Sequence, residues 1–394
     1  MNSTITSKDM TRRNALAGAA ASFLILKPET AFGFQANSAL TLGIIGTGSR
    51  GRFDGTIFAK DPRVRLAAIC DVQQSSIDAA KAQIPGGDSA QVFTDHQQLL
   101  AAAGIDCVLI ATPIFLHPEQ FDHAVSARKH IYCEKAAGAD VAGVKRLMRA
   151  GERADKTKHI QFGFQQRYGP EYLTAEKIVT SGQLGEMLLM RSHWMVSGSV
   201  KPAAKPKPAY ASLAEEKLRN WYSWKETCGD FIVEQDCHGV DVLNWYAKSH
   251  PLLASGAGGK KIRPYGDCND HANITYEYAN GLRGLLHGCQ LAQGWSLVNE
   301  QFFGTDGTVE TSRQYYRWNR STAARAGGLP PLQEVKSKRE PTYDAVERFL
   351  DLIVAGKPEN STVDAAESTL TSLLGRMAVE TKRVITWDEM LRSG

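Results

Sequence analysis

The chain of 394 residues lacks any long hydrophobic segment and any strong excess of charge. No apolar run approaches the ~20 residues that a membrane-spanning helix needs, so no transmembrane segment is predicted. The formal net charge is +4. It falls to +2 without residues 1–33, which carry four basic and two acidic side chains. This balance gives no electrostatic reason to expect nucleic acid or a membrane surface as a partner.

Closely spaced cysteine pairs are also missing. The seven cysteines include no C-x-x-C spacing, so no zinc cage or other metal site is predicted. Cys70, Cys107 and Cys133 fall in or beside apolar runs and are expected to be buried thiols. The remaining cysteines could pair in an oxidising compartment. A protein exported already folded would not need such a bond, and we predict none.

The N-terminal segment has the features of an export signal. Arg12 and Arg13 stand just before the moderately apolar run 15–26, and small residues follow around Ala31. This pattern resembles a twin-arginine signal for folded proteins. The residues after Arg13 match the usual pattern less well, and a disordered basic tail is the alternative. We predict a signal peptide at 1–33 and a periplasmic or otherwise exported protein.

The rest of the chain divides into two patterns of secondary structure. From residue 42 to 163, short apolar runs alternate with helical patterns; the runs are LGIIG, VRLAAIC, DCVLIAT, HIYCE and HIQFGF. Such strands indicate a parallel sheet covered on both faces. Beyond about residue 180, longer and partly alternating strands indicate an open, mostly antiparallel sheet. The predicted fold class is α/β, with one domain at 38–165 and another at 166–394, whose last helices could pack back on the first domain.

A glycine-rich loop, GTGSRG, directly follows the first strand and precedes a helical pattern. Its residues are Gly46, Thr47, Gly48, Ser49, Arg50 and Gly51. In the G-x-G-x-x-G spacing, the glycines allow a tight turn, close approach of a pyrophosphate, and close helix–strand packing. Asp71 lies 20 residues beyond Gly51, where an acid binds the ribose 2′-hydroxyl of NAD. No arginine follows Asp71, so the loop predicts a Rossmann domain that binds NAD in preference to NADP.

Further motifs follow in a fixed order. They are ATPIFLH at 111–117, the pair Glu134 and Lys135, GFQQRY at 163–168 and the segment 234–241. Together with the glycine loop and Asp71, they resemble the Gfo/Idh/MocA family of nucleotide-dependent sugar oxidoreductases over about residues 40–385. The resemblance implies a Rossmann domain and a C-terminal α/β domain whose open sheet often forms oligomer contacts. It also implies a site in the cleft between the two domains.

The resemblance also assigns roles to individual residues. Thr112, Pro113 and His117 match the family's loop beside the nicotinamide ribose. Glu134 and Lys135 match a Glu-Lys-Pro motif whose lysine hydrogen-bonds the reacting hydroxyl. We therefore group Glu134 with the cofactor-binding residues and Lys135 with the catalytic ones.

The chain departs from the family pattern at two points. Ala136 follows Lys135 where the family has proline, and a cis bond is far rarer before alanine. Either the loop differs locally or the site holds strain. The later family pattern D-x-G-x-H-x-x-D runs here from Glu234 to Asp241, with Asp236 in place of the glycine. The longer side chain of Glu234 leaves its role open.

Oxidation of a secondary alcohol needs one acceptor for a hydride and another for a proton. Histidine titrates near neutral pH, which favours His238 as the general base. Lys135 would place positive charge near the developing alkoxide. Glu234 lies four residues before His238 and would share a helix face with it. On this hypothesis Glu234 orients His238 or the substrate; the alternative is a structural pair on a helix surface.

Five further residues are predicted to contact the substrate. They are Arg167, Tyr168, Asp241, Trp221 and Trp224. An aspartate can hold a sugar hydroxyl, and exposed indole rings pack well against the C–H faces of sugars. The alternative for the two tryptophans is the core, where large aromatic side chains are more often found.

Three functions remain open from the sequence. The first is an exported NAD-dependent oxidoreductase that acts on a secondary hydroxyl of a sugar, polyol or glycoside and forms homo-oligomers. Free NAD should be scarce outside the cytoplasm, so a second is a redox-neutral glycosidase that keeps NAD bound. A third is a non-catalytic sugar-binding protein, although retention of Lys135 and His238 argues against it.

Overall fold

The structure is a computed structural model that describes residues 39–198, 212–291, 293–320, 333–336 and 339–394. The predicted signal peptide at 1–33 lies outside these residues. Among the described helices, none has the length and apolar character required to cross a membrane. Residues 40–394 form one compact unit, which contains both sheets of the fold.

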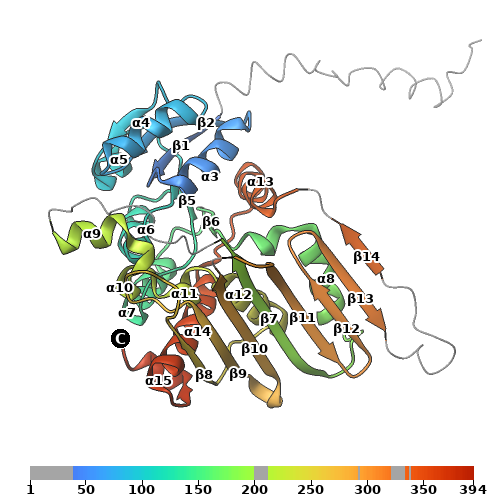
Figure 1. The fold of residues 1–394 in the computed structure, drawn as a ribbon. Helices are drawn as coiled ribbons and strands as arrows, with labels where there is room; N and C mark the ends of the chain where they lie inside the picture. Colours follow the sequence, from blue (N-terminus) through green and yellow to red (C-terminus); the bar gives the residue numbers. More distant parts are fainter. Residues whose placement is uncertain (1–38, 199–211, 292, 321–332, 337–338) are drawn as a thin grey trace, which may run out of the picture. The chain divides into compact units, whose positions relative to one another are not determined.

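The first sheet has six parallel strands in the order β3-β2-β1-β4-β5-β6 (Figure 1). The strands are β1 (Leu40–Ile45), β2 (Val64–Cys70), β3 (Gln91–Phe93), β4 (Cys107–Ile110), β5 (His130–Cys133) and β6 (Ile160–Phe162). Ile45 pairs with both Cys70 and Ile110, so β1, β2 and β4 end at the same edge. The strand order reverses between β1 and β4, and such a switch point is where open α/β sheets bind ligands.

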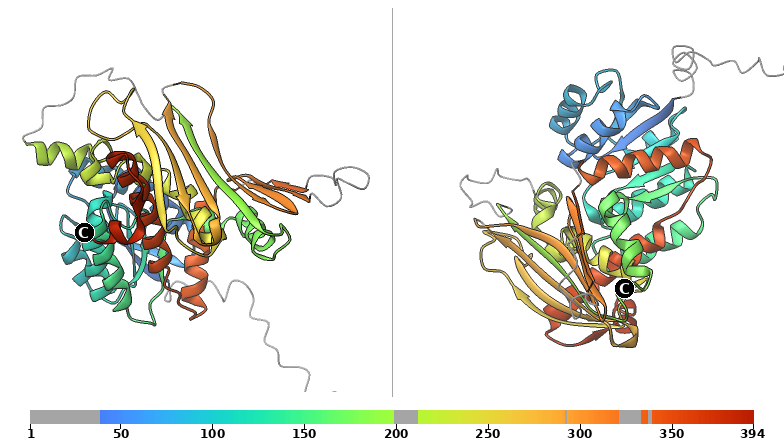
Figure 2. Two further views of the ribbon diagram at one scale, coloured as in Figure 1. Left: turned by 90° about the horizontal axis from the view of Figure 1, so that it is seen from below. Right: turned by 90° about the vertical axis from the view of Figure 1, so that its right-hand side faces the viewer.

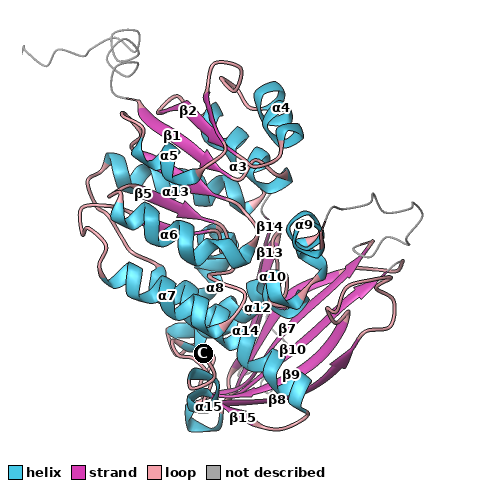
Figure 3. Ribbon diagram, turned by 90° about the vertical axis from the view of Figure 1, so that its left-hand side faces the viewer, coloured by secondary structure: helices cyan, strands magenta, loops and turns pink. Residues whose placement is uncertain are grey.

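Helices cover both faces of this sheet, as the strands' continuous apolar sequences predict. One face carries α3 (Ser49–Lys60), α4 (Gln74–Gln83) and α13 (Pro341–Val354). The other carries α5 (His96–Ala101), α6 (His117–Ser126) and α7 (Val141–Glu152) (Figure 3). Successive residues of β5 alternate between the two cores, with Tyr132 in one and Ile131 and Cys133 in the other.

The helix α13 belongs to the C-terminal part of the sequence but packs on the first sheet. The ring of Phe349 meets those of Phe58 and Tyr132 edge to face, each at 5.7 Å between ring centroids. Near the start of the helix, Thr342 Oγ1 accepts a hydrogen bond of 3.2 Å from Arg50 Nη2. The helix α13 therefore completes the hydrophobic core on one face of the first sheet.

The second sheet has nine strands in the order β14-β13-β12-β11-β7-β10-β9-β8-β15. The strands are β7 (Met187–Ser197), β8 (Leu253–Gly259), β9 (His271–Glu277), β10 (Arg283–Leu291), β11 (Leu297–Gly304), β12 (Gly307–Thr311), β13 (Tyr315–Arg320), β14 (Gln333–Lys336) and β15 (Ile385–Thr386). Among the described strands of this sheet, only β7 and β10 pair in parallel. The predicted α/β class, with a parallel sheet and a mostly antiparallel one, is confirmed.

Helices cover one face of the second sheet. They are α8 (Pro170–Thr180), α12 (Cys237–Ala247) and α14 (Thr362–Thr381) (Figure 2). Along β10, buried and half-buried residues alternate strictly, as expected for a sheet with one covered face. The remaining helical segments are η1 (Ile114–Leu116), η2 (Gln165–Tyr168), α9 (Leu213–Arg219), η3 (Trp221–Ser223), α10 (Lys225–Cys228), α11 (Phe231–Glu234), η4 (Ala279–Gly281) and α15 (Trp387–Leu391).

Candidate active site

The glycine loop connects β1 to α3 at the switch point of the first sheet. Gly46 has a φ of +89°, a conformation that favours glycine. A Cβ on Gly51 would lie 1.9 Å from the carbonyl oxygen of Gly46, so only glycine allows this helix to pack so closely. A Cβ on Gly48 would meet nothing within 4 Å. The backbone is therefore open at the start of α3, which no side chain caps.

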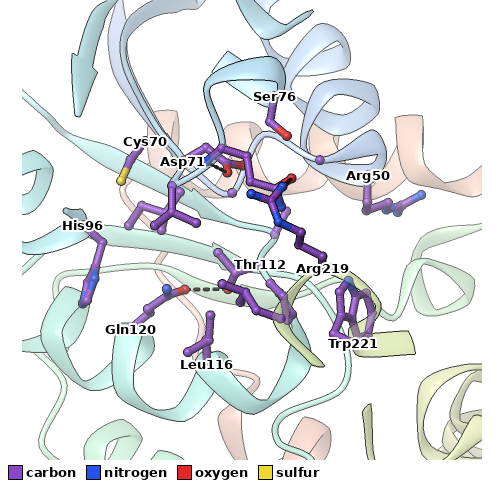
Figure 4. Close-up of a pocket in the computed structure, with 18 of the residues that line it drawn as sticks. Arg50, Cys70, Asp71, Ser76, His96, Thr112, Leu116, Gln120, Arg219 and Trp221 are labelled. Carbon is purple, nitrogen blue, oxygen red and sulfur yellow. Dashed lines mark hydrogen bonds between the residues drawn. The ribbon is translucent and has the colours of Figure 1, made fainter. Parts of the chain in front are cut away.

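A cavity of about 300 Å³ lies over this loop (Figure 4). Among the predicted cofactor residues, Gly46, Gly48, Ser49, Arg50, Asp71, Thr112 and Pro113 line it. The helix α9 and the segment η3 contribute Leu218, Arg219 and Trp221 from the other half of the chain. Arg219 Nη1 donates to Gln73 Oε1 at 2.9 Å, which joins α9 to the segment that follows Asp71.

Asp71 stands at the end of β2 and is held by the glycine loop. Its Oδ2 accepts from the backbone N–H of Thr47 at 2.8 Å and from Thr47 Oγ1 at 3.1 Å. Its Oδ1 accepts from the N–H of Gln73 at 2.9 Å. Thr47 is fully buried and supports Asp71 instead of lining the cavity. A carboxylate fixed in this way keeps lone pairs for a ribose hydroxyl.

His117 contacts the backbone of Thr112, in the loop that is predicted to lie beside the nicotinamide ribose. Its Nδ1 faces the carbonyl oxygen of Ala136 at 2.8 Å, and its Nε2 faces that of Thr112 at 2.9 Å. The ring is 1% exposed and lines neither this cavity nor the one described next. The ring of His117 therefore connects the loop at Thr112 with the loop at Ala136.

A second cavity of about 400 Å³ adjoins the first. The two cavities share Ser49, Arg50, Ala111, Thr112 and Trp221. The second is also lined by Ile114, Glu134, Lys135, Gln165, Trp194, Tyr222, Glu234, Gln235, His238 and Arg313. All three predicted catalytic residues, Lys135, Glu234 and His238, thus face one cavity that has a wall in common with the glycine-loop cavity.

Glu134 and Lys135 follow β5 and point to different partners. Glu134 Oε1 lies 3.0 Å from Arg50 Nη2, so this acid forms an ion pair with a residue of α3. Lys135 Nζ lies 3.1 Å from Glu234 Oε1 and also donates to the backbone oxygen of Glu234. The Lys135–Ala136 peptide bond is cis. This cis bond precedes an alanine at the position where the family pattern has proline.

The Lys135–Glu234 pair fixes the charge of the lysine. Burial by itself would lower the pKa of Lys135, but the groups around it, with the Glu234 carboxylate contributing most, together outweigh burial and raise the pKa. Lys135 is therefore an ammonium at neutral pH. It can stabilise negative charge on a substrate oxygen.

His238 is buried against aromatic rings. Its ring stacks on Trp194 with 5.2 Å between centroids and meets Phe164 edge to face at 6.0 Å. Its Nδ1 is buried and has no hydrogen-bond partner among the described residues. Burial, reinforced by the positive charges of Lys135 and Arg313, lowers the pKa of His238 well below 6.5. The imidazole is therefore neutral at pH 7 and can accept a proton.

Both parts of the chain match known protein families. Residues 40–162 match the oxidoreductase family with an NAD-binding Rossmann fold, GFO_IDH_MocA. Residues 172–310 match the GFO/IDH/MocA C-terminal domain.

The chain belongs to the Gfo/Idh/MocA family. The inositol 2-dehydrogenase of Corynebacterium glutamicum (strain R) is 33% identical over 156 residues, which are 39% of this chain and 45% of that enzyme. The match therefore spans less than half of that protein.

Solved structures of the same fold cover nearly the whole described chain. One is scyllo-inositol dehydrogenase from Lactobacillus casei with bound NAD(H) and scyllo-inositol, with a TM-score of 0.68 and 18% identity over 89% of this chain and 99% of that one. Another is levoglucosan dehydrogenase with NADH and levoglucosan, with a TM-score of 0.74 and 18% identity over 88% and 99%. At this identity the two structures establish that this chain shares their fold.

The residues that line the first cavity are suited to bind NAD, the cofactor of the family's Rossmann domain. The uncapped start of α3 beside the open Gly48 offers backbone N–H groups to a pyrophosphate. Asp71 offers a carboxylate to a ribose, and the shared wall at Thr112 leads to the second cavity. When bound, NAD would supply the acceptor for a hydride.

One predicted feature of the site is wrong. Glu234 and His238 do not share a helix face, because α11 ends at Glu234 and α12 begins at Cys237. No hydrogen bond joins them among the described residues, because the Glu234 carboxylate is drawn to the ammonium of Lys135. Both side chains nevertheless reach the second cavity from opposite sides of the break.

Four of the five predicted substrate residues line neither cavity, and three of these are Arg167, Tyr168 and Asp241. Arg167 and the fully buried Asp241 form a two-pronged ion pair, with Nε–Oδ2 and Nη2–Oδ1 distances of 2.8 Å. Ser368 on α14 also donates to Asp241 at 2.7 Å. Tyr168 packs against the core of the first sheet. The contacts of Arg167, Asp241 and Ser368 join η2, α12 and α14, and the structure brings none of the three predicted substrate residues to either cavity.

The two predicted tryptophans separate. Trp221 lines both cavities, whereas Trp224 lines neither and packs beneath the ammonium of Lys217 at 5.8 Å. Three cavity residues had no local signal in the sequence: Trp194 within β7, Arg219 in α9, and Arg313 between β12 and β13. Each reaches the site only because separate elements of the second half pack over the first sheet.

Proposed function

We propose that this protein oxidises a secondary hydroxyl of a sugar, polyol or glycoside, with NAD as the hydride acceptor. The proposal rests on one observation: Lys135, Glu234 and His238 line a cavity that shares a wall with the cavity over the glycine loop. The names of the similar enzymes, which act on inositols and levoglucosan, support a sugar or polyol as the substrate.

The chain's own residues would hold the hydroxyl and take its proton. The ammonium of Lys135 would hydrogen-bond the hydroxyl oxygen and stabilise the charge that develops on it. The ring of His238 would accept the proton, because burial and nearby cations lower its pKa and so leave it unprotonated at neutral pH. Glu234 would keep Lys135 protonated and in place.

The test is turnover by the purified protein. The protein is incubated with NAD and a panel of sugars, polyols and glycosides, and NADH is followed at its absorbance maximum. Formation of NADH that is lost in His238→Ala but kept in His250→Ala supports the proposal. His250 is a matched control because it stacks on Trp387 and lines neither cavity.

Two outcomes would overturn the proposal. Cleavage of a glycoside without net NADH would indicate a redox-neutral glycosidase that uses bound NAD. Sugar binding with neither NADH nor cleavage would indicate a binding protein. Both measurements use the same samples, so the three functions are separated in one series.

We also propose that the protein is exported through its N-terminal segment. The two arginines before an apolar run support this proposal. Replacement of Arg12 and Arg13 by lysine should retain the protein inside the producing cell, as measured by fractionation. Equal export of both forms would rule out the twin-arginine route.

We propose further that the uncovered face of the second sheet forms a homo-oligomer. Along β10, half-buried side chains such as Leu285 and His287 alternate with core residues. Light scattering of the purified full-length protein should give a mass of two or more times the 43.1 kDa of one chain. A mass of one chain at micromolar concentration would contradict this proposal.

A further inference from the structure

Among the described residues, one positively charged side chain that lines the second cavity forms no ion pair with a carboxylate. Arg50 is paired with Glu134 at 3.0 Å, and Lys135 is paired with Glu234 at 3.1 Å. These two acids are the only ones in the described lining of the cavity. Arg313 also lines the cavity, and no ion pair joins it to a carboxylate of the described chain.

Arg313 is held in place by neutral groups. It lies between β12 and β13, with its guanidinium carbon 5.2 Å from the centre of the Trp194 ring. Gln165 is best oriented with its amide nitrogen donating to Gly163 O at 2.7 Å and its oxygen accepting from Arg313 Nη2 at 3.2 Å. The Nε of Arg313 is buried and has no acceptor among the described residues.

A nearby buried acid does not neutralise this arginine. Glu300 lies within the electrostatic range of Arg313, but burial raises the pKa of Glu300 to about 8. At neutral pH most of this carboxyl is protonated, and it accepts hydrogen bonds from Tyr172 and Thr311. The charge of Arg313 is thus left for a group that enters the cavity.

The position of Arg313 relates this charge to the reacting group. The ring of Trp194 contacts both the guanidinium of Arg313 and the ring of His238. An anion bound to Arg313 would therefore lie close to His238, because Trp194 contacts both side chains. A sugar whose hydroxyl reaches His238 would present its own substituents to Arg313.

We propose that the substrate is a sugar or glycoside that carries an oxyanion group, which Arg313 binds. The planar guanidinium can give two parallel hydrogen bonds to a carboxylate, and Trp194 restricts its rotation beforehand. A sulfate or phosphate ester presents the same oxyanion chemistry. The proposal rests on the proposed sugar substrate, but it concerns binding and is tested without turnover.

The experiment compares matched neutral and anionic ligands on the NAD-loaded protein. The probes are methyl glucoside, methyl glucuronide, glucose 6-sulfate and glucose 6-phosphate, and binding is measured by calorimetry. The glucuronide or an ester should bind at least about tenfold more tightly than the glucoside. The preferred anionic probe identifies the carboxylate or ester as the group that is recognised.

Variants attribute the preference to one residue. Arg313→Gln should reduce the ratio of the affinity for anionic probes to that for the neutral probe by about tenfold. Arg313→Lys keeps the positive charge but cannot give two parallel hydrogen bonds, so it should reduce this ratio less. Arg317→Gln is the matched control, because Arg317 lies on the adjoining strand β13 and does not line the cavity. If Arg313→Gln fails to fold, the lysine variant alone still tests the ratio.

Two results would overturn the anion site: equal affinity of the wild-type protein for all four probes, or equal loss of preference in the Arg313 and Arg317 variants. Failure of the proposed oxidation is a separate result. It would appear as anion-selective binding with no NADH from any sugar, and it would leave the anion site in place.

Discussion

The ammonium of Lys135 lies 3.1 Å from the carboxylate of Glu234, ninety-nine residues further along the chain. Lys135 lies two residues beyond the end of β5 in the first sheet, and Glu234 ends α11 in the second half. This single ion pair therefore joins the two halves of the molecule at the centre of the proposed chemistry. Its strength should depend on both halves being correctly folded.

Replacing Glu234 by glutamine should lower the pKa of Lys135. The amide keeps the size of the side chain but removes the charge that offsets the burial of the ammonium. The alkaline limb of kcat/KM should therefore move to lower pH, and kcat should fall by about tenfold or more. Steady-state kinetics from pH 6 to 11 measure both. Glu226→Gln, at an exposed acid paired with Lys217, is the control; an alkaline limb that does not move in Glu234→Gln would contradict this prediction.

The low pKa of His238 should set the acid limb of the reaction. The ring stays neutral at pH values well below 6.5, so the base remains available there. The acid limb of kcat/KM should consequently lie below pH 6.5, and His238→Ala should lower kcat by about 10²–10⁴-fold. An acid limb above pH 7 in the wild-type enzyme would show that another group accepts the proton.

Asp71 should determine the choice of cofactor. Its carboxylate is positioned by Thr47 and Gln73, and it can accept a bond from a ribose hydroxyl but would repel a 2′-phosphate. Asp71→Asn should weaken NAD binding by about tenfold, the value of one charge-assisted hydrogen bond, and narrow the preference over NADP. Fluorescence titration with both cofactors measures this. Asp78→Asn on the surface of α4 should change neither affinity.

The Arg167–Asp241 pair should matter for stability. Asp241→Asn leaves the buried guanidinium of Arg167 without its main partner, at a cost of about 3–5 kcal/mol in the free energy of unfolding. Asp364 also contacts Arg167 at 3.2 Å but is 57% exposed, so Asp364→Asn should cost less than about 1 kcal/mol. Urea unfolding compares the two. Equal losses would mean that the buried pair contributes no more than the surface pair.

Glu300 should make stability decrease as the pH rises. Burial raises its pKa from 4.5 to about 8 in the folded chain, so folding favours the protonated acid. This contribution is complete below pH 4.5 and is lost as the pH rises through 8; the total is on the order of a few kcal/mol.

Glu300→Gln mimics the protonated acid and should flatten the stability profile between pH 5 and 8. The control is Glu310→Gln. Partial burial would raise the pKa of Glu310, but hydrogen bonds from Tyr315 and Gln301 lower it, so its contribution changes only below pH 5. Thermal unfolding across this range measures both variants. A slope in Glu300→Gln equal to that of the wild type would refute the assignment.

The parts of the site whose geometry is set by residues adjacent in the sequence could be predicted from the sequence. The glycine loop, Asp71 and Lys135 each follow a buried strand, and parallel strands bring their carboxyl ends to one edge. The two sheets followed from the change in strand pattern. In these cases the local sequence carries the geometry, because strand ends and tight turns are set by a few adjacent residues.

Other parts depend on contacts between distant segments. Nothing in the turn that contains Arg313 distinguishes it from an exposed surface arginine, and only the packing of Trp194 brings it to the cavity. The break between α11 and α12 separates Glu234 from His238, although helical spacing favoured one continuous face. Asp241 lies three residues after His238 in the sequence, which suggested a substrate contact, but in the structure it is buried and paired with Arg167.

The position of α13 has a consequence for how the protein is made. Phe349 completes a cluster with Phe58 and Tyr132, yet about 200 residues are synthesised between Tyr132 and this helix. During synthesis, the side of the first sheet that α13 covers remains open to solvent until almost the whole chain has left the ribosome. A nascent chain that stops before residue 341 would therefore expose these rings and be a target for chaperones or proteases.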